Sequence, residues 1–150
     1  MANFEINFPD DFLSDLLDSD FEEVAKAALE ETAPTLKTSI QSSIRSVVSH
    51  TGDSELVNSV KISKPKRTST DAWIINVGPA GKSSNYYYSY GTTKRVKRKY
   101  AVSNVLKAVW LEYGRVGQTA KPWLTSATEN VRGTIMDKMQ DIYNKKVGAK

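Results

Sequence analysis

Two long stretches of the sequence carry apolar residues at the three- and four-residue steps of an amphipathic helix. The first stretch begins at Phe21 and the second follows Pro122. Their apolar positions are Phe21, Val24, Ala28, Leu36, Ile40, Ile44 and Val47 in the first, and Leu124, Ala127, Val131, Ile135, Met139 and Ile142 in the second. Because such a stripe is stable only when it is buried, the chain must fold so that a long helix near each end packs on a core.

Several residues predict where these helices bend or end. Pro34 should kink or split the first helix near Thr32, because proline removes one hydrogen bond and crowds the previous turn. Gly52 can end that helix in the left-handed conformation, and the helix dipole favours a cation at His50. Pro122 suits the first turn of the last helix.

The sequence predicts a short helix near the N-terminus and a frayed tail at the C-terminus. After Pro9, an aspartate can cap a short helix whose apolar residues share one face, within an acidic N-terminal segment, residues 1–20. These apolar residues are Phe12, Leu13, Leu16 and Leu17. The last helix should continue to about Tyr143, and the tail, residues 144–150, should fray.

In the middle of the chain the helical spacing of apolar residues gives way to short runs rich in valine and isoleucine. LVNSVKIS and DAWIINVG predict two strands joined by the polar turn KPKRTST. Residues 80–100 sustain neither period and predict a long, exposed, basic and Tyr-rich loop. Residues 101–113 fit both a helix and a strand, so their period leaves both open. The 150 residues therefore predict one α+β domain, with a small antiparallel sheet packed against the two helices.

Charge is divided unevenly along the chain. Through Glu31 there are ten acidic residues and one basic residue, and from Thr32 onward seven acidic and twenty basic residues, which gives the net charge of +4. Opposite charge at the two ends suits docking against copies of the same chain or against charged neighbours. Solvated faces that happen to differ in sign explain the same pattern equally well.

No set of catalytic or cofactor-binding residues is recognisable. The absence of cysteine excludes disulfides, thiol nucleophiles and thiolate metal sites. WIINVGPAGKSS has only Pro79 and Ala80 between its glycines, too few for a phosphate loop. A lone His50 does not make a nucleophilic triad, and the acidic residues between Asp15 and Glu23 lack the order of a calcium loop. We expect no enzyme, cofactor or bound metal, and neither a signal peptide nor a membrane span.

The Tyr-rich segment next to KRVKRKY leaves two interpretations. Basic residues neutralise phosphates and aromatic rings stack on bases, so nucleic-acid binding is one. A segment that becomes ordered against an acidic protein surface is the other, and we prefer it, because no standard nucleic-acid motif surrounds the tyrosines.

WLEYG, followed after a short loop by KPWLTSA and an amphipathic helix, resembles the signature of the HK97 gp10-like proteins. These belong to the neck and tail-completion machinery of tailed phages. Upstream, Thr51-Gly52 and LVNSV are similar to that family's Thr-Gly-x-Leu-x-x-Ser-Ile stretch. The resemblance covers residues 21 to 143. The residues that carry it are Gly52, Leu56, Ser59, Glu112, Tyr113, Gly114, Pro122, Trp123, Leu124 and Ala127.

The chain also departs from the family pattern. Two extra residues stand between Gly52 and Leu56, Tyr113 and Trp123 replace phenylalanines, and Thr125-Ser126 occupies a place where proline is common. We can assign no counterpart in the family pattern to the acidic N-terminal segment or to the Tyr-rich loop.

The resemblance implies a non-enzymatic component of the virion at the head-tail junction, made in the host cytoplasm. Its partners would be its own copies in a ring, commonly a hexamer, the neck proteins, the tail tube protein and DNA passing through the channel. It also favours a strand for Lys107 to Tyr113, with Glu112 fixing the turn at Gly114 and Trp123 seating the last helix on the sheet. The expected contact residues are Tyr86, Tyr87, Tyr88, Tyr90, Lys94, Arg95, Lys97, Arg98, Lys99 and Arg115. The alternative is a nucleic-acid-binding module that uses the same basic segment.

Overall fold

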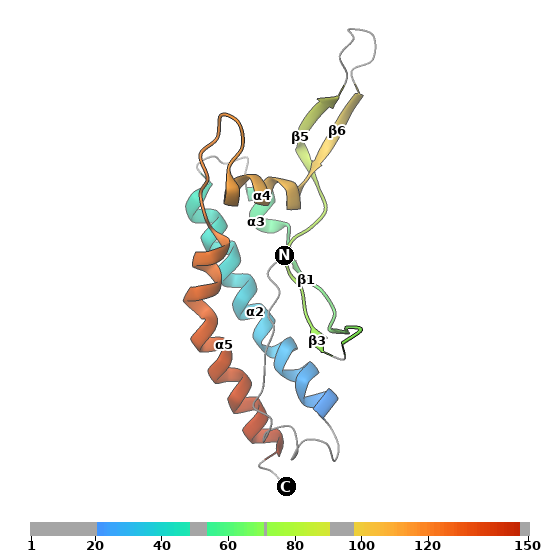
Figure 1. Ribbon diagram of the computed structural model, residues 1–150, viewed down its shortest axis with the longest axis vertical. Coiled ribbons are helices and arrows are strands. Elements are labelled where there is room, and N and C mark those ends of the chain that lie inside the picture. The colour runs from blue at the N-terminus through green and yellow to red at the C-terminus, as the bar shows by residue number, and fades with distance from the viewer. Residues whose placement is uncertain (1–20, 49–53, 71, 91–97, 148–150) are drawn as a thin grey trace.

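Two long antiparallel helices form the body of the molecule (Figure 1). The computed structural model describes residues 21–48, 54–70, 72–90 and 98–147. Helix α2 (Phe21–Val47) lies beside α5 (Leu124–Val147). The described chain also forms α3 (Ser54–Asn58), α4 (Asn104–Tyr113) and three pairs of strands, one of which projects from the body beyond α4. The short helix expected after Pro9, and the expected helix end at His50 and Gly52, lie outside the described residues.

Hydrogen bonds and an ion pair connect α2 to α5 along the length of both helices and show that the two helices run antiparallel. The Ser43 hydroxyl donates to the Trp123 carbonyl at 2.7 Å, and the Ser39 hydroxyl donates to the Ala127 carbonyl at 2.8 Å. At the other end Lys146 forms an ion pair of 3.2 Å with Glu23. As the residue number rises along α2, that of its partner falls in α5.

Helix α2 runs through Pro34 as one helix of 27 residues, so the expected split near Thr32 is wrong. Proline inside a helix costs about 3 kcal/mol, because it has no N–H to donate to the carbonyl one turn earlier and its ring crowds that turn. Burial offsets this cost, since Ala33 and Leu36 on either side belong to the core. Side chains add bonds nearby: the Thr32 hydroxyl donates to the Ala28 carbonyl at 2.7 Å.

Helix α5 also extends further than its sequence predicted. It continues past Tyr143 to Val147, so residues 144–147 are helical and not frayed as expected. Residues 148–150 lie outside the described residues. Ile142 is buried, and Lys145 and Lys146 occupy the last turn, where the helix dipole favours cations.

The expected two-strand region is an interrupted hairpin preceded by a short helix. Strand β1 (Val60–Ile62) pairs with β4 (Val77–Pro79), and β2 (Lys66–Arg67) pairs with β3 (Trp73–Ile74). The first residues of LVNSVKIS belong instead to α3, because neighbouring Leu56 and Val57 are both buried, which a strand packed on one face does not allow.

Residues 80–100 are not one long loop, and that prediction is wrong for the described part. Strand β5 (Lys82–Tyr90) pairs antiparallel with β6 (Arg98–Ser103), with a register irregularity between Lys82 and Tyr87. Residues 91–97 lie outside the described residues. Tyrosine favours strands, and backbone pairing can form a ribbon without the alternation that the sequence analysis required.

Residues 104–113 form a helix, so the strand that the family resemblance favoured for Lys107 to Tyr113 is wrong. The hydroxyl of Ser103 caps α4 by accepting from the Leu106 N–H at 3.1 Å. Ala108 is buried against the core, and Gly114 ends the helix with its N–H donating to the Trp110 carbonyl.

The core lies where α2, α5, α3 and the first hairpin meet. Its side chains with less than 2% exposure include Ile40, Ile44, Leu56 and Val60. The fold is α+β as predicted, with strand pairing divided among three two-stranded antiparallel sheets instead of one.

Candidate functional site

The end of the molecule that carries α4 and the β5–β6 hairpin brings most of the signature residues together (Figure 1). Glu112, near the end of α4, accepts hydrogen bonds from the backbone N–H groups of Trp123 and Leu124, each at 2.8 Å. A carboxylate at the first N–H groups of a helix satisfies donors that have no partner inside the helix and complements the dipole. Glu112 therefore caps α5, whereas we expected it to fix the Gly114 turn.

Trp123 connects three helices. Its side chain is 4% exposed, and its indole N–H donates to the Ala108 carbonyl of α4 at 3.0 Å. Its own carbonyl accepts from Ser43 of α2. We expected Trp123 to seat the last helix on the sheet. That expectation is wrong, because the indole of Trp123 bonds to helix α4. Ala127, one turn further, is fully buried.

The loop between α4 and α5 folds back tightly on Gly114. Gly114 has a φ of 77°, and a β-carbon there would lie 2.8 Å from the Gln118 carbonyl oxygen. The Lys121 N–H donates to the Leu111 carbonyl at 2.7 Å, and the Lys121 ammonium donates to the Val47 carbonyl at the end of α2. Pro122 is exposed and precedes α5 by two residues, so it is not in the first turn.

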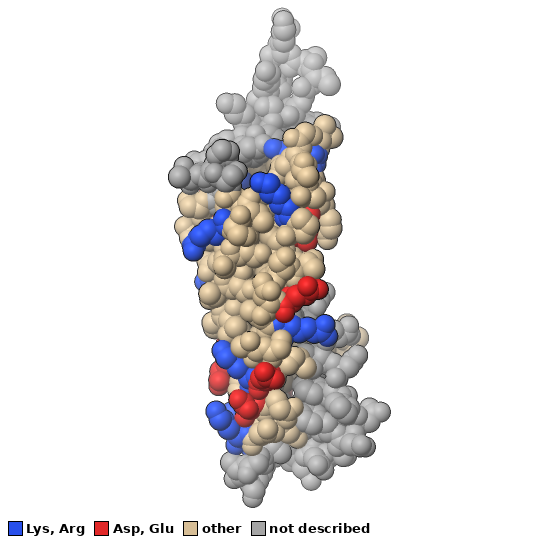
Figure 2. Space-filling view, turned by 90° about the vertical axis from the view of Figure 1, so that its left-hand side faces the viewer, with Lys and Arg blue, Asp and Glu red and all other residues tan. Residues whose placement is uncertain are grey.

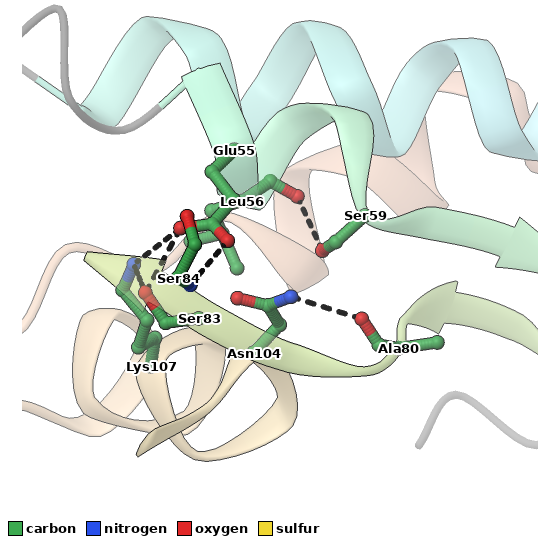
Figure 3. Close-up of polar contacts among 8 residues, drawn as sticks. All are labelled: Glu55, Leu56, Ser59, Ala80, Ser83, Ser84, Asn104 and Lys107. Atoms are coloured by element: carbon green, nitrogen blue, oxygen red, sulfur yellow. Dashed lines mark hydrogen bonds and ion pairs between the residues drawn. The ribbon is translucent and has the colours of Figure 1, made fainter. Parts of the chain in front are cut away.

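The root of the β5–β6 hairpin is fixed by Glu55 of α3 (Figure 3). One carboxylate oxygen accepts from the Ser84 N–H at 2.6 Å and the other from the Ser83 hydroxyl at 2.9 Å. The Lys107 ammonium donates to the Ser83 hydroxyl at 3.2 Å and lies 4.0 Å from Glu55. The bond from the Ser84 N–H, followed by that from Ser83, lowers the pKa of Glu55 from its usual value of 4.5.

A serine next to a lysine is also an arrangement found in nucleophilic catalysis. Here the Ser83 hydroxyl donates to a carboxylate and the residue is only 2% exposed, so a substrate has no access to its oxygen. Asn104 lies beside this cluster, and its amide donates to the Ala80 carbonyl at 2.9 Å. The cluster holds the hairpin to α3 and α4.

Leu56 and Ser59, the other described signature residues of this region, belong to the same structural unit. Leu56 is 1% exposed in the core, and the Ser59 hydroxyl donates to the Leu56 carbonyl at 2.7 Å, which closes α3 before β1 begins. Gly52 lies outside the described residues.

The expected contact residues are divided between the hairpin and the loop after α4. The four tyrosines lie in β5 and Arg98 and Lys99 in β6, where Tyr88 pairs with Tyr100 and Tyr90 with Arg98. Arg115 is exposed, and its guanidinium lies 4.5 Å from the centre of the Trp110 ring. Lys94, Arg95 and Lys97 lie outside the described residues. Their role in contacts stays a prediction.

Helix α4 exposes an apolar surface that the sequence analysis did not anticipate. Of the six large apolar side chains that are exposed in the described part of the chain, five lie on α4 or just after it. We call these five the α4 face: Val105, Leu106, Val109, Tyr113 and Val116. The period of residues 101–113 left helix and strand open, and neither period tells whether an apolar stripe is covered by the same chain.

The chain matches the model of the HK97-gp10-like family, described as "Bacteriophage HK97-gp10, putative tail-component", over residues 10–114 of the 150. The chain belongs to this family. No curated protein and no solved structure matches it.

Membership of the HK97-gp10-like family supports a structural role in a phage and association with the virion. The matched range begins at residue 10, so the family model extends into the acidic N-terminal segment and across the Tyr-rich segment, to which the sequence analysis could assign no counterpart. It ends at Gly114, so it includes Leu56, Ser59 and Glu112 but not Trp123 or Ala127. The fold joins the two parts, because Glu112 inside the matched range caps the helix outside it.

The described residues contain neither a metal-binding cluster of acidic and histidine side chains nor a membrane-spanning helix. No group of three or more histidine, aspartate or glutamate side chains in residues 21–48, 54–70, 72–90 and 98–147 lies together as a metal site would require. Across those same segments, no helix combines the length and the apolar character needed to span a bilayer.

Glu55 should make the stability of this HK97-gp10-like protein depend on pH. Because the folded pKa of Glu55 is lowered, its contribution is fully present above pH 4.5 and is lost as the pH falls through the folded pKa. Glu55→Gln should cost about 1–2 kcal/mol at pH 7, since a charge-assisted bond is weakened at a partly exposed site, and less as the pH falls below 4.5.

Urea unfolding of both proteins from pH 7 to pH 3 measures this difference. Glu129→Gln, which alters an exposed carboxylate of α5, is the matched control and should show no such convergence. A constant difference between the wild type and Glu55→Gln over this range would contradict the assignment.

Proposed function

We propose that this protein is a head-tail joining or tail-completion component of a tailed phage. It assembles as a ring, a hexamer in the virion, between the neck proteins and the tail tube. The family supports this proposal because its members are phage tail components. A component of this kind works through its surfaces. This agrees with a site whose polar residues, Glu112 and Glu55, hold structural elements in place.

The observation that carries the proposal is the β5–β6 hairpin, which leaves the body beyond α4 (Figure 1). It is a two-stranded sheet, so each strand keeps one edge that no other described strand pairs with. An open edge can pair with a strand of another chain, which gives affinity through the backbone. The Glu55 cluster fixes the root of the hairpin and so fixes its direction relative to α4.

The charges support a docking role for the same end. On the face in Figure 2, basic side chains predominate towards the upper end, whereas acidic and basic side chains are mixed in the lower half. In the ring, the tyrosines and basic residues of the hairpin contact the neighbouring subunit, the neck or the tail tube. Some lysine or arginine side chains face DNA in the channel and neutralise its phosphates without reading its sequence.

Mass measurement of the full-length protein, alone and with the tail tube protein of the same phage, tests the proposal. Six copies of 16.7 kDa give a ring of about 100 kDa, which should be visible as a ring by electron microscopy. Purified virions should contain the chain at the head-tail junction. Virions that lack this polypeptide would overturn the proposal.

The nucleic-acid-binding alternative makes a different prediction for the same sample. A monomer that binds DNA with a steep loss of affinity as salt rises, and that enters neither a ring nor a tail, would favour that alternative. The head-tail joining role predicts at most weak DNA binding by the isolated chain.

A further inference from the structure

The α4 face is a compact apolar strip on the solvent side of one helix. Val105, Val109 and Tyr113 follow one another at four-residue spacing, and their exposed fractions are 43%, 43% and 77%. Residues four apart lie on the same side of a helix, so these side chains form one surface. Scattered exposed apolar residues are ordinary, whereas a cluster of them marks a contact surface.

The segment of sequence that carries the α4 face is basic. Between residues 98 and 121 the chain carries five basic residues and one acidic residue, Glu112. The Glu112 carboxylate is occupied by the N-terminus of α5, and that of nearby Glu55 by Ser83 and Ser84. Arg115 and Lys121 are exposed in the loop that follows α4. A partner for this surface therefore needs apolar side chains with acidic residues around them.

One stretch of this chain has that chemistry. Residues 10–18, DDFLSDLLD, contain four aspartates, no basic residue and the apolar side chains Phe12, Leu13, Leu16 and Leu17. The sequence spacing of these apolar residues is that of a short amphipathic helix. We call residues 10–18 the N-terminal stretch.

The chain before α2 is too short for all four apolar side chains of the N-terminal stretch to cover the α4 face of their own chain. Trp123 ties α4 to Ser43, and Phe21 lies 22 residues before Ser43, which is about 33 Å along an α-helix. From Phe21, a fully extended chain brings Phe12 at most about 31 Å and Leu17 about 14 Å. A helical stretch would reach about half as far or less. Figure 1 shows the start of α2 and helix α4 at opposite ends of the body.

We propose that the N-terminal stretch of one subunit binds the α4 face of the next, an inference that rests on the proposed ring. Phe12, Leu13, Leu16 and Leu17 cover the apolar strip, and the aspartates face Arg115 and Lys121. Because the contact joins two different surfaces of identical chains, it repeats from subunit to subunit and closes into a ring when the rotation allows.

Cysteine cross-linking tests this contact directly, because the natural chain has no cysteine. Full-length Leu16→Cys is mixed with full-length Val109→Cys and oxidised, alone and with the tail tube protein. The matched control replaces Val109→Cys with Met136→Cys, since Met136 of α5 is an exposed apolar residue of similar exposure, 45% against 43%. Binding should give about tenfold or more disulfide-linked dimer with Val109→Cys, because it raises the local concentration of the two thiols.

The double variant Leu16→Cys/Val109→Cys gives a second readout. It should form a ladder of covalent multimers that ends at the size of the ring. A disulfide within one chain, equal yields with Met136→Cys, or cross-linking of Val109→Cys to the tube protein in place of Leu16→Cys would overturn the inference.

Mass measurement on the same samples separates the two proposals. A ring that assembles without the Leu16–Val109 cross-link overturns this contact and leaves the proposed function intact. A chain that neither assembles nor cross-links overturns the contact, and the content of the virion then decides the function.

Discussion

Replacing Trp123 with alanine should lower the free energy of unfolding by about 3–5 kcal/mol and the Tm by roughly 6–20 °C. The side chain is 4% exposed, so its loss leaves a cavity where α2, α4 and α5 meet. It also removes the donor to the Ala108 carbonyl, which belongs to a buried residue and loses its bond to the indole N–H. Both effects act at the same place, which makes this one of the most destabilising single changes expected in the chain.

Trp123→Phe separates the two effects. Phenylalanine fills most of the volume but cannot donate to Ala108, so this variant should lose about 1–3 kcal/mol and fall between the wild type and Trp123→Ala. Urea unfolding followed by circular dichroism measures all three proteins. A loss below about 1 kcal/mol for Trp123→Ala would show that Trp123 does not anchor α5 to α4.

The sequence predicted those elements whose signal is local and repeated. In α2, the stripe that contains Ile40 and Ile44 spans several turns, and both residues are fully buried in the folded chain. In α5, the stripe that contains Ala127 and Ile135 is equally regular. Long periodic stripes survive a local conflict such as Pro34, because burial over many turns outweighs one lost hydrogen bond.

Short elements could not be predicted in the same way. Helix α4 and strand β1 have too few residues for a period to decide, and their type is set by Ser103, which caps α4, and by pairing of β1 with β4. The partner of Glu112 is also set in space: the N–H groups that it caps lie 11 and 12 residues away. A signature can mark such a residue, but only the folded chain shows what it binds.

The α4 face shows a further limit. Val105 and Val109 have the spacing of core residues, yet both are 43% exposed. A sequence pattern reports that a face is apolar and not which chain covers it. For a chain that assembles with copies of itself, an apolar stripe predicted as core is equally a candidate interface.

Gly114→Ala should be the second large loss of stability, about 3 kcal/mol or more, and Gly117→Ala provides its matched control. Both glycines have a φ of 77°, which other residues rarely adopt, and Gly114 also has a ψ of 177°, a combination that is essentially confined to glycine. Each substitution therefore strains the backbone by about 1–3 kcal/mol. At Gly117 a new β-carbon meets nothing within 4 Å. At Gly114 it would lie 2.8 Å from the Gln118 oxygen and 2.9 Å from the Ala120 nitrogen.

The atoms that oppose a β-carbon at Gly114 are backbone atoms, so no side-chain rotation relieves the overlap. The 118–121 segment must move, and with it the Lys121 bonds to Leu111 and Val47. Gly114→Ala should therefore lose at least about 1–2 kcal/mol more than Gly117→Ala in urea unfolding, and its α5 amides should exchange faster with deuterium. Equal losses for the two variants would mean that the close approach at Gly114 adds nothing beyond the backbone angle that both glycines share.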